Sequence, residues 1–83
     1  MLYMVRVEVS LKQGHSDPEG ETTARALREL VYPVKNVGVS KMYTIVLEAG
    51  SEKEAEDQVE EMCRRLLANP TKDNYALKVE EAK

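Results

Sequence analysis

The first segment of this chain alternates strictly in residue type, which restricts the folds open to it. Apolar side chains occupy every second position of residues 2–11, namely Tyr3, Val5, Val7, Val9 and Leu11. The positions between them are mixed, with charged side chains at Arg6 and Glu8. A period of two is typical of a strand with one buried face, and the valines favour a strand further. The segment therefore predicts a sheet that is packed on one face.

Two helices are predicted from their caps and their apolar stripes. Asp17 has the chemistry of an N-cap, and Pro18 suits the first helical position, because proline has no N–H to satisfy there. This first helix is expected to run to about Val31, and Tyr32-Pro33 ends it. Its expected core-facing stripe is Thr23, Ala24, Leu27, Leu30 and Val31.

The second helix begins with the capping-box pattern of Ser51 and Glu54. Asn69-Pro70 stops it, because proline cannot continue a helix and restricts the residue before it. The expected apolar stripe is Ala55, Val59, Met62, Cys63, Leu66 and Leu67.

Three further strands are expected, at residues 34–42, 43–49 and 75–79. No Asn-Gly type signal marks the turn near Lys41. The resulting order, β-α-β-β-α-β, predicts a single α+β domain over residues 1–83. It favours a ferredoxin-like sandwich, a four-stranded antiparallel sheet with both helices on one face. The strands at 2–11 and 43–49 are expected to be central neighbours.

The size of the chain points to association with other chains. Eighty-three residues bury a small core, and such domains usually gain stability from disulfides, metals or partner subunits. Cys63 and His15 are the only residues of their types, so neither an internal disulfide nor a Cys/His zinc cluster is expected. The second face of the sheet mixes apolar with charged side chains. Self-association through this face, or by pairing of sheet edges, is therefore expected.

The charge balance and the length of the apolar runs argue against two classes of partner. The formal net charge is −3, with 12 basic and 15 acidic residues, and no basic stripe is present. Nucleic-acid binding depends largely on neutralising phosphates, so no nucleic-acid partner is expected. No run of apolar residues approaches the roughly 20 that span a bilayer. No membrane partner is expected, and a cytoplasmic location is predicted.

No catalytic, cofactor-binding or metal site is predicted from the residues. His15 lies in a loop beside Ser16 and Asp17, but adjacent side chains rarely orient one another, so a solvated histidine is favoured over a catalytic one. Cys63 lies on an apolar stripe, which favours a buried, inert thiol. The carboxylates of residues 52–61 are expected on a solvated helix face, where Glu60 and Glu61 have the i,i+4 spacing of ion pairs with Arg64 and Arg65.

Several short motifs together resemble the PurS family, the small subunits of formylglycinamide ribonucleotide amidotransferase, also called phosphoribosylformylglycinamidine synthase. The resemblance covers nearly the whole chain. Its carriers are Gly14, Asp17, Pro18 and Gly20, then Ala26, Leu27 and Lys41, and finally Met62-Cys63 with Leu66-Leu67-Ala68-Asn69-Pro70 followed by Tyr75. Members often show Arg-x-Gly-Lys before the third strand, whereas this chain has Gly38-Val39-Ser40-Lys41, so a role that depends on that arginine is not carried over.

The resemblance implies a non-catalytic subunit of a ligase complex that forms an amidine from formylglycinamide ribonucleotide, glutamine and ATP. It implies a homodimer, or a dimer of dimers, that bridges a PurQ-like glutaminase and a PurL-like synthetase and supports ammonia transfer between them. ATP and Mg²⁺ would be used by the assembled complex and not bound by this chain. The candidate partner contacts are Gly14, Asp17, Pro18, Gly20, Lys41, Asn69 and Pro70.

Other functions are compatible with the same topology, because one fold hosts many functions. The main alternative is a regulatory module that binds a small ligand, such as an amino acid, at a dimer interface. Base stacking in an RNA-binding domain is poorly supported, because the chain has no Phe or Trp.

Overall fold

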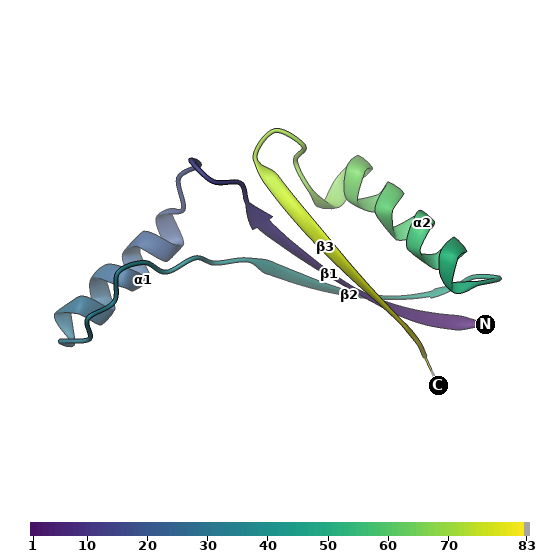
Figure 1. The fold of residues 1–83 in the computed structure, drawn as a ribbon, viewed down its shortest axis with the longest axis horizontal. Helices are drawn as coiled ribbons and strands as arrows, with labels where there is room; N and C mark the ends of the chain where they lie inside the picture. The colour runs from purple at the N-terminus through teal and green to yellow at the C-terminus, as the bar shows by residue number, and fades with distance from the viewer. Residues whose placement is uncertain (83) are drawn as a thin grey trace.

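The computed structural model describes residues 1–82 as three antiparallel strands and two helices (Figure 1). In chain order the elements are β1 (Leu2–Leu11), α1 (Pro18–Glu29), β2 (Lys41–Glu48), α2 (Glu52–Met62), a π-helical turn η1 (Cys63–Leu67) and β3 (Asp73–Glu81). No helix among the described residues is long and apolar enough to cross a bilayer.

The alternation of β1 places this strand at the centre of the sheet. The strand order is β2-β1-β3, and Val7 lies opposite Tyr43 on one side and Leu77 on the other. Val5 and Val7 are fully buried, whereas Arg6 and Glu8 are exposed. The predicted half-buried strand is confirmed. The final strand is longer than the predicted 75–79.

One face of the sheet is covered by α2 alone. The fully buried side chains are Val5 and Val7 of β1, Val59 of α2 and Cys63 of η1. Partly buried side chains of β2 and β3 pack around this cluster. The expected burial of Cys63 is confirmed. The core is thus a single layer between one helix and one sheet.

The two leucines of η1, the turn that continues α2, lie in different environments. The Ala68 N–H donates to the Cys63 carbonyl at 3.0 Å, the i→i+5 bond of a π-turn. This wider turn delays the rotation of the helix, so Leu67 reaches the core side. Leu66 is 83% exposed. The prediction that Leu66 belongs to the buried stripe is therefore wrong, because it assumed continuous α-helical periodicity.

The expected four-stranded sheet is also wrong, because the chain does not reverse near Lys41. Residues 34–40 are not part of the sheet, and they continue straight into β2 (Figure 1). The predicted strands at 34–42 and 43–49 are therefore an unpaired segment followed by a single strand, β2. Consequently β1 is central, and β2 is an edge strand of this chain.

The placement of both helices on one face is wrong for α1. This helix ends at Glu29, not Val31, and projects away from the sheet without substantial packing against any described strand or α2 (Figure 1). The described residues extend over 51 × 29 × 14 Å, with a radius of gyration of 16.3 Å. A compact domain of this length has a radius of about 12 Å. The chain is therefore strongly elongated.

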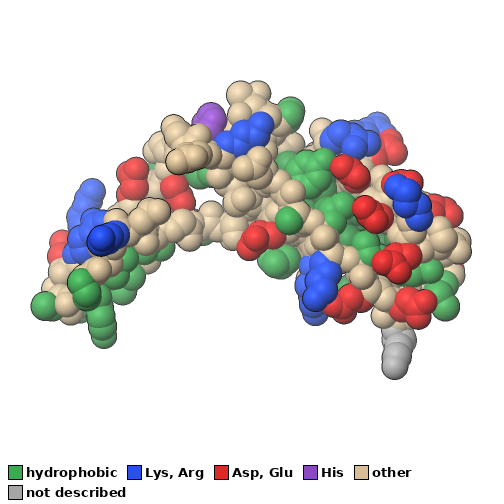
Figure 2. All heavy atoms as spheres, viewed as in Figure 1, with side chains coloured by type: hydrophobic (Ala, Val, Ile, Leu, Met, Phe, Trp, Pro, Cys, Tyr) green, Lys and Arg blue, Asp and Glu red, His purple; other side chains and the backbone are tan. Residues whose placement is uncertain are grey.

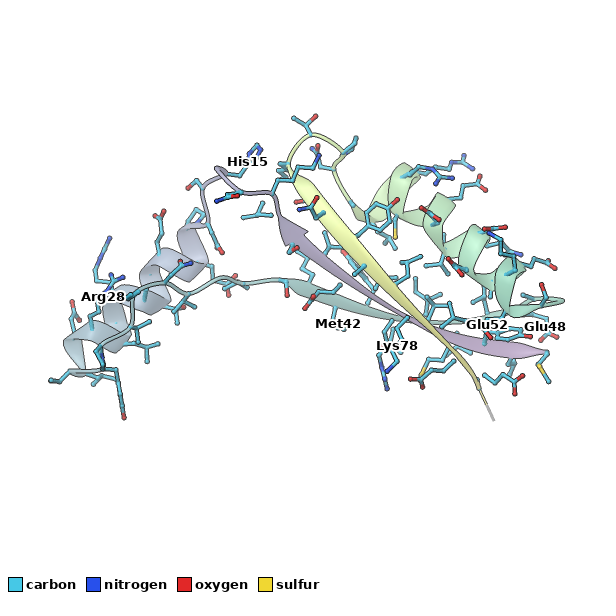
Figure 3. The ribbon with its side chains drawn as sticks, in the orientation of Figure 1. His15, Arg28, Met42, Glu48, Glu52 and Lys78 are labelled. Carbon is cyan, nitrogen blue, oxygen red and sulfur yellow. The ribbon has the colours of Figure 1, made fainter. Side chains whose placement is uncertain are left out.

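The face of the sheet opposite α2 has the expected mixed character. Leu2, Met42 and Val46 are 45%, 58% and 58% exposed. The Arg6 guanidinium lies 3.6 Å from the Glu80 carboxylate on this face. Met42 and Lys78 project from the side of the sheet away from α2 (Figure 3). This surface is open to solvent in the single chain.

Candidate functional site

Asp17 joins the start of α1 to a segment much later in the chain. Its Oδ1 accepts the Gly20 N–H at 2.9 Å, as predicted for the N-cap, and its Oδ2 accepts the Val39 N–H at 3.0 Å. These two backbone donors favour the charged form and hold the pKa of the Asp17 carboxyl below its ordinary value. The Asp17 side chain therefore caps α1 and also links Val39 to the start of this helix.

Two further contacts hold residues 34–40 against α1. A Cβ at Gly20 would collide with the Val37 carbonyl oxygen, so glycine lets residues 34–40 run close to the helix. Near the other end, Arg28 donates to the carbonyls of Val34 and Lys35 at 2.8 and 2.7 Å. We call residues 17–40, which include α1 and this returning segment, the arm.

The Asn69-Pro70 corner is held by its own hydrogen bonds. The Asn69 side chain accepts the Thr71 N–H at 2.9 Å, and the Asn69 N–H donates to Asp73 Oδ2 at 2.9 Å. The Lys12 ammonium donates to the Pro70 carbonyl at 2.9 Å, which ties the loop after β1 to this corner. Asn69 therefore has a structural role in the turn before β3.

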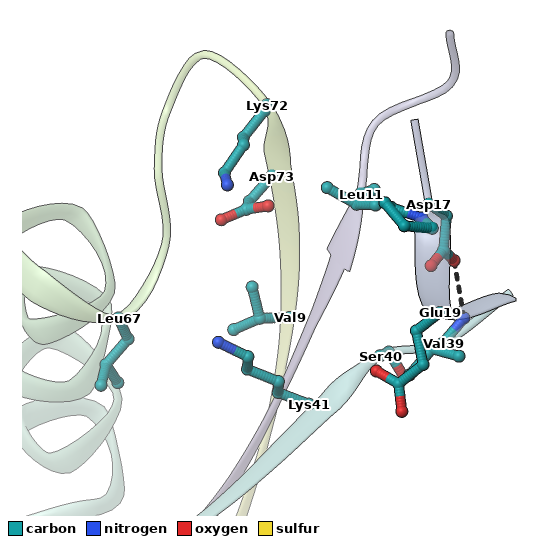
Figure 4. A pocket seen from close by; sticks show the side chains of 11 residues that line it. Val9, Leu11, Asp17, Glu19, Val39, Ser40, Lys41, Leu67, Lys72 and Asp73 are labelled. Atoms are coloured by element: carbon teal, nitrogen blue, oxygen red, sulfur yellow. Dashed lines mark hydrogen bonds between the residues drawn. The ribbon is translucent and has the colours of Figure 1, made fainter. Parts of the chain in front are cut away.

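A hollow of about 260 Å³ lies where the arm meets the sheet (Figure 4). Of the predicted contact residues, Asp17, Pro18 and Lys41 line it. Gly14, Gly20, Asn69 and Pro70 do not. Gly14 has a positive φ of 90° in the loop before α1, a conformation that glycine adopts without strain. The sequence motifs thus converge on the junction between arm and sheet but do not form one pocket.

The lining of this hollow is of mixed charge. Lys41 and Lys72 extend across it near Asp73, and Glu19 lies on the side of α1 (Figure 4). The Ser40 hydroxyl donates to Glu8 at 3.1 Å beside it. The surface favours neither an anion nor a cation by charge alone.

The residues singled out for chemistry have structural or solvated positions. His15 is exposed in the loop before α1 (Figure 3), and the Cys63 side chain is buried. Burial raises the pKa of the Cys63 thiol, with a further contribution from the nearby Glu60, so the neutral thiol is favoured. Among residues 1–82 no three His, Cys, Asp or Glu side chains are grouped to hold a metal ion.

The sequence reasoning missed the exposed apolar side chains that the structure brings to the surface. Leu30, Val31 and Tyr32, at the far end of the arm, are 67%, 88% and 58% exposed, and hydrophobic atoms gather there (Figure 2). Leu66 is exposed in η1, directly after α2. The sequence predicts Leu30, Val31 and Leu66 as parts of core-facing stripes, which is wrong, and Tyr32 only as the end of the first helix. Only the displacement of α1 and the π-turn show otherwise.

The fold and the candidate site describe a class of protein: a small, open α+β protein whose candidate contacts are surface turns and exposed apolar side chains. A family model described as PurS, phosphoribosylformylglycinamidine (FGAM) synthase, matches residues 4–81. The PurS subunit of FGAM synthase from Methanocaldococcus jannaschii is 43% identical over 81 residues, which cover 96% of this chain and 98% of that protein. The chain belongs to the PurS family.

Solved structures agree with this assignment over the full length. PurS from Thermus thermophilus has a TM-score of 0.89 and 36% identity, and the match covers 100% of both chains. A chain of the PurLQS structure from Thermotoga maritima has a TM-score of 0.88 and 31% identity, with 96% of this chain and 99% of that chain covered. Family members are thus subunits of an FGAM synthase, a ligase of purine biosynthesis.

Proposed function

We propose that this chain is the non-catalytic small subunit of FGAM synthase, that it connects a PurQ-like glutaminase to a PurL-like synthetase, and that it supports ammonia transfer between them. The full-length match to a chain of the PurLQS structure carries this proposal. The chain's own residues support it, because the histidine is solvated, the thiol is buried and large apolar side chains are exposed. ATP and Mg²⁺ are then requirements of the assembled complex.

Self-association is part of the same proposal. The chain acts as a homodimer or a dimer of dimers, because its single-layer core is small and three apolar regions are left in solvent. These regions are the tip of the arm, the open face of the sheet and the end of α2. The predicted partner contacts at Gly14, Asp17, Pro18, Gly20, Lys41, Asn69 and Pro70 are proposed for the larger subunits.

The test is to reconstitute the two larger subunits with and without this chain. We expect the three proteins to co-purify, and we expect omission of this chain to reduce amidine formation when glutamine supplies the nitrogen. Ammonium salts in place of glutamine bypass the transfer step, so activity with ammonium should fall much less. Equal glutamine-dependent activity without the chain would contradict the proposal, as would amidine formation by the chain alone.

A further inference from the structure

A second hollow lies on the arm itself, between α1 and the returning segment. Its volume is about 290 Å³, and it shares no lining residue with the hollow at the junction of arm and sheet. The charged side chains that line it are Glu21, Arg25, Arg28 and Lys35. Three cations against one carboxylate leave this lining with a net charge of +2, in a chain whose formal net charge is −3. The hollow therefore concentrates positive charge against the balance of the chain.

The cations of this hollow differ from most others in the chain because they lack a carboxylate partner. Elsewhere, five cationic side chains lie 2.8–3.8 Å from a carboxylate, namely Arg6, Lys53, Arg64, Arg65 and Lys78. Within residues 1–82, Arg25, Arg28 and Lys35 make no such ion pair. The positive charge of the hollow is thus available to an anion from outside the chain.

The Arg28 guanidinium is fixed in position at this hollow (Figure 3). Its Nε and one Nη donate to the carbonyls of Val34 and Lys35, so the returning segment holds the side chain without cancelling its charge. The other Nη makes no hydrogen bond within residues 1–82, and neither do the backbone N–H and side-chain amide of Asn36, which also lines the hollow. Donors from both sides of the arm are therefore free to bind one acceptor group.

We propose that this hollow is a binding site for a phosphate group, carried by a small phosphate monoester or by inorganic phosphate. A phosphate monoester has a charge of about −1.5 to −2 near neutral pH, which matches the net charge of the lining, whereas a carboxylate has a single charge. A fixed guanidinium with further cations around it suits the several oxygens of phosphate. The volume is at the lower end of the roughly 300–1,000 Å³ of small-molecule sites, so it fits a phosphate and its nearest atoms rather than a whole nucleotide.

A phosphate bound here connects the two sides of the arm. It contacts α1 through Arg25 and Arg28 and the returning segment through Lys35 and Asn36. Because a ligand that binds only the folded arm stabilises it, the arm should become more rigid when phosphate is bound. This inference goes beyond the proposed function and needs only the isolated chain, so its failure would leave the role in FGAM synthase intact.

Four single variants change the charge of the chain inside or outside the hollow. Arg25→Gln and Lys35→Gln each remove one cation from the lining, and Glu21→Gln removes its carboxylate. Lys78→Gln is the matched control, because it removes a cation from the open face of the sheet (Figure 3). All four side chains are exposed, so the fold tolerates each change, and circular dichroism checks this.

The measurement is an NMR titration of the full chain at constant ionic strength with glycerol phosphate, inorganic phosphate or sodium acetate. The amide shifts of Asn36 and Val37 should saturate with both phosphates, and acetate should change them no more than sodium chloride does. Arg25→Gln and Lys35→Gln should each raise the dissociation constant by about threefold or more, and Glu21→Gln should lower it by about threefold. Lys78→Gln should leave it within about twofold of wild type. Tighter binding of glycerol phosphate than of inorganic phosphate would identify a monoester as the source, and the opposite order the free ion.

Shifts that do not saturate, or that acetate reproduces, would overturn the proposal. So would a saturable dissociation constant that Arg25→Gln and Lys35→Gln leave unchanged. A second measurement needs no variant: saturating glycerol phosphate should slow amide hydrogen exchange of α1 in the wild-type chain. Exchange that is unchanged by the ligand would contradict a phosphate bound between α1 and the returning segment.

Discussion

The two halves of this molecule are held together by different forces. The body, made of β1, β2, β3 and α2, buries Val5, Val7, Val59 and Cys63 completely. In the arm only Gly20 and Ala24 are buried, and the links to its returning segment are hydrogen bonds from Asp17 and Arg28. Hydrophobic burial stabilises a fold in proportion to area, whereas exposed hydrogen bonds contribute little. We infer that the body folds by itself and that the arm depends on contacts outside its own chain.

The largest expected difference is between Val59→Asp in the body and Leu30→Asp in the arm. Val59 is fully buried, so an unpaired charge there should cost at least about 4 kcal/mol and abolish cooperative unfolding. Leu30 is 67% exposed, so its replacement should change the stability of the monomer by no more than about 0.5 kcal/mol.

Urea denaturation, monitored by circular dichroism below the concentration at which copies associate, provides the measurement. Similar losses of stability in the two variants would show that the arm and the body form one cooperative core.

A smaller loss of stability, confined to the arm, is expected from Gly20→Ala. Gly38→Ala is its matched control. A Cβ at Gly20 meets the Val37 carbonyl oxygen, so the returning segment must move away from α1, at a cost of roughly 1–3 kcal/mol within the arm. A Cβ at Gly38 meets no atom within 4 Å. Amide hydrogen exchange of α1 should accelerate in the first variant only. Equal exchange in both would contradict the close packing of the arm.

The smallest expected effect is the change in the stability of the arm when the Asp17 carboxylate is protonated. Its carboxylate contributes stability to the arm above the ordinary Asp pKa, because its folded-state pKa is lowered by the N–H groups of Gly20 and Val39. That contribution should be lost as the pH falls below about 4, through the lowered pKa.

Asp17→Asn retains one oxygen for the cap but removes the second acceptor. The amide shift of Val39 should therefore depend on pH in the wild type and be flat in Asp17→Asn. An amide shift of Val39 that does not change with pH in either protein would show that the hydrogen bond from Val39 to Asp17 does not form.

The features predicted correctly from the sequence are those that local chemistry decides. The alternation of β1, the Asp17 cap and the ion pairs of Glu60 and Glu61 with Arg64 and Arg65 are all present. The Ser51 hydroxyl accepts the Glu54 N–H as a capping box requires, although the Glu54 carboxylate accepts the N–H of Gly50 and not of Ser51.

The features predicted wrongly depend on more than local pattern. Residues 34–42 have the pattern of a strand, but whether they fold back on β2 or continue straight into it depends on the turn near Lys41, which no local turn signal marks. Leu66 and Leu67 both fit a helical stripe, and one π-turn decides which of them is buried. Of the candidate contact residues taken from motifs, Asp17, Pro18 and Lys41 lie at the junction of arm and body, whereas the exposed apolar tip of the arm was not predicted.

Hydrogen exchange at two protein concentrations tests most directly whether the arm depends on a second copy. Above the dimer dissociation constant, the amides of α1 and of residues 34–40 should be protected. Upon dilution below it, their exchange should accelerate while that of Val5 and Val7 in β1 stays slow. Protection of the arm that is independent of concentration would contradict the account, as would loss of protection in arm and body together.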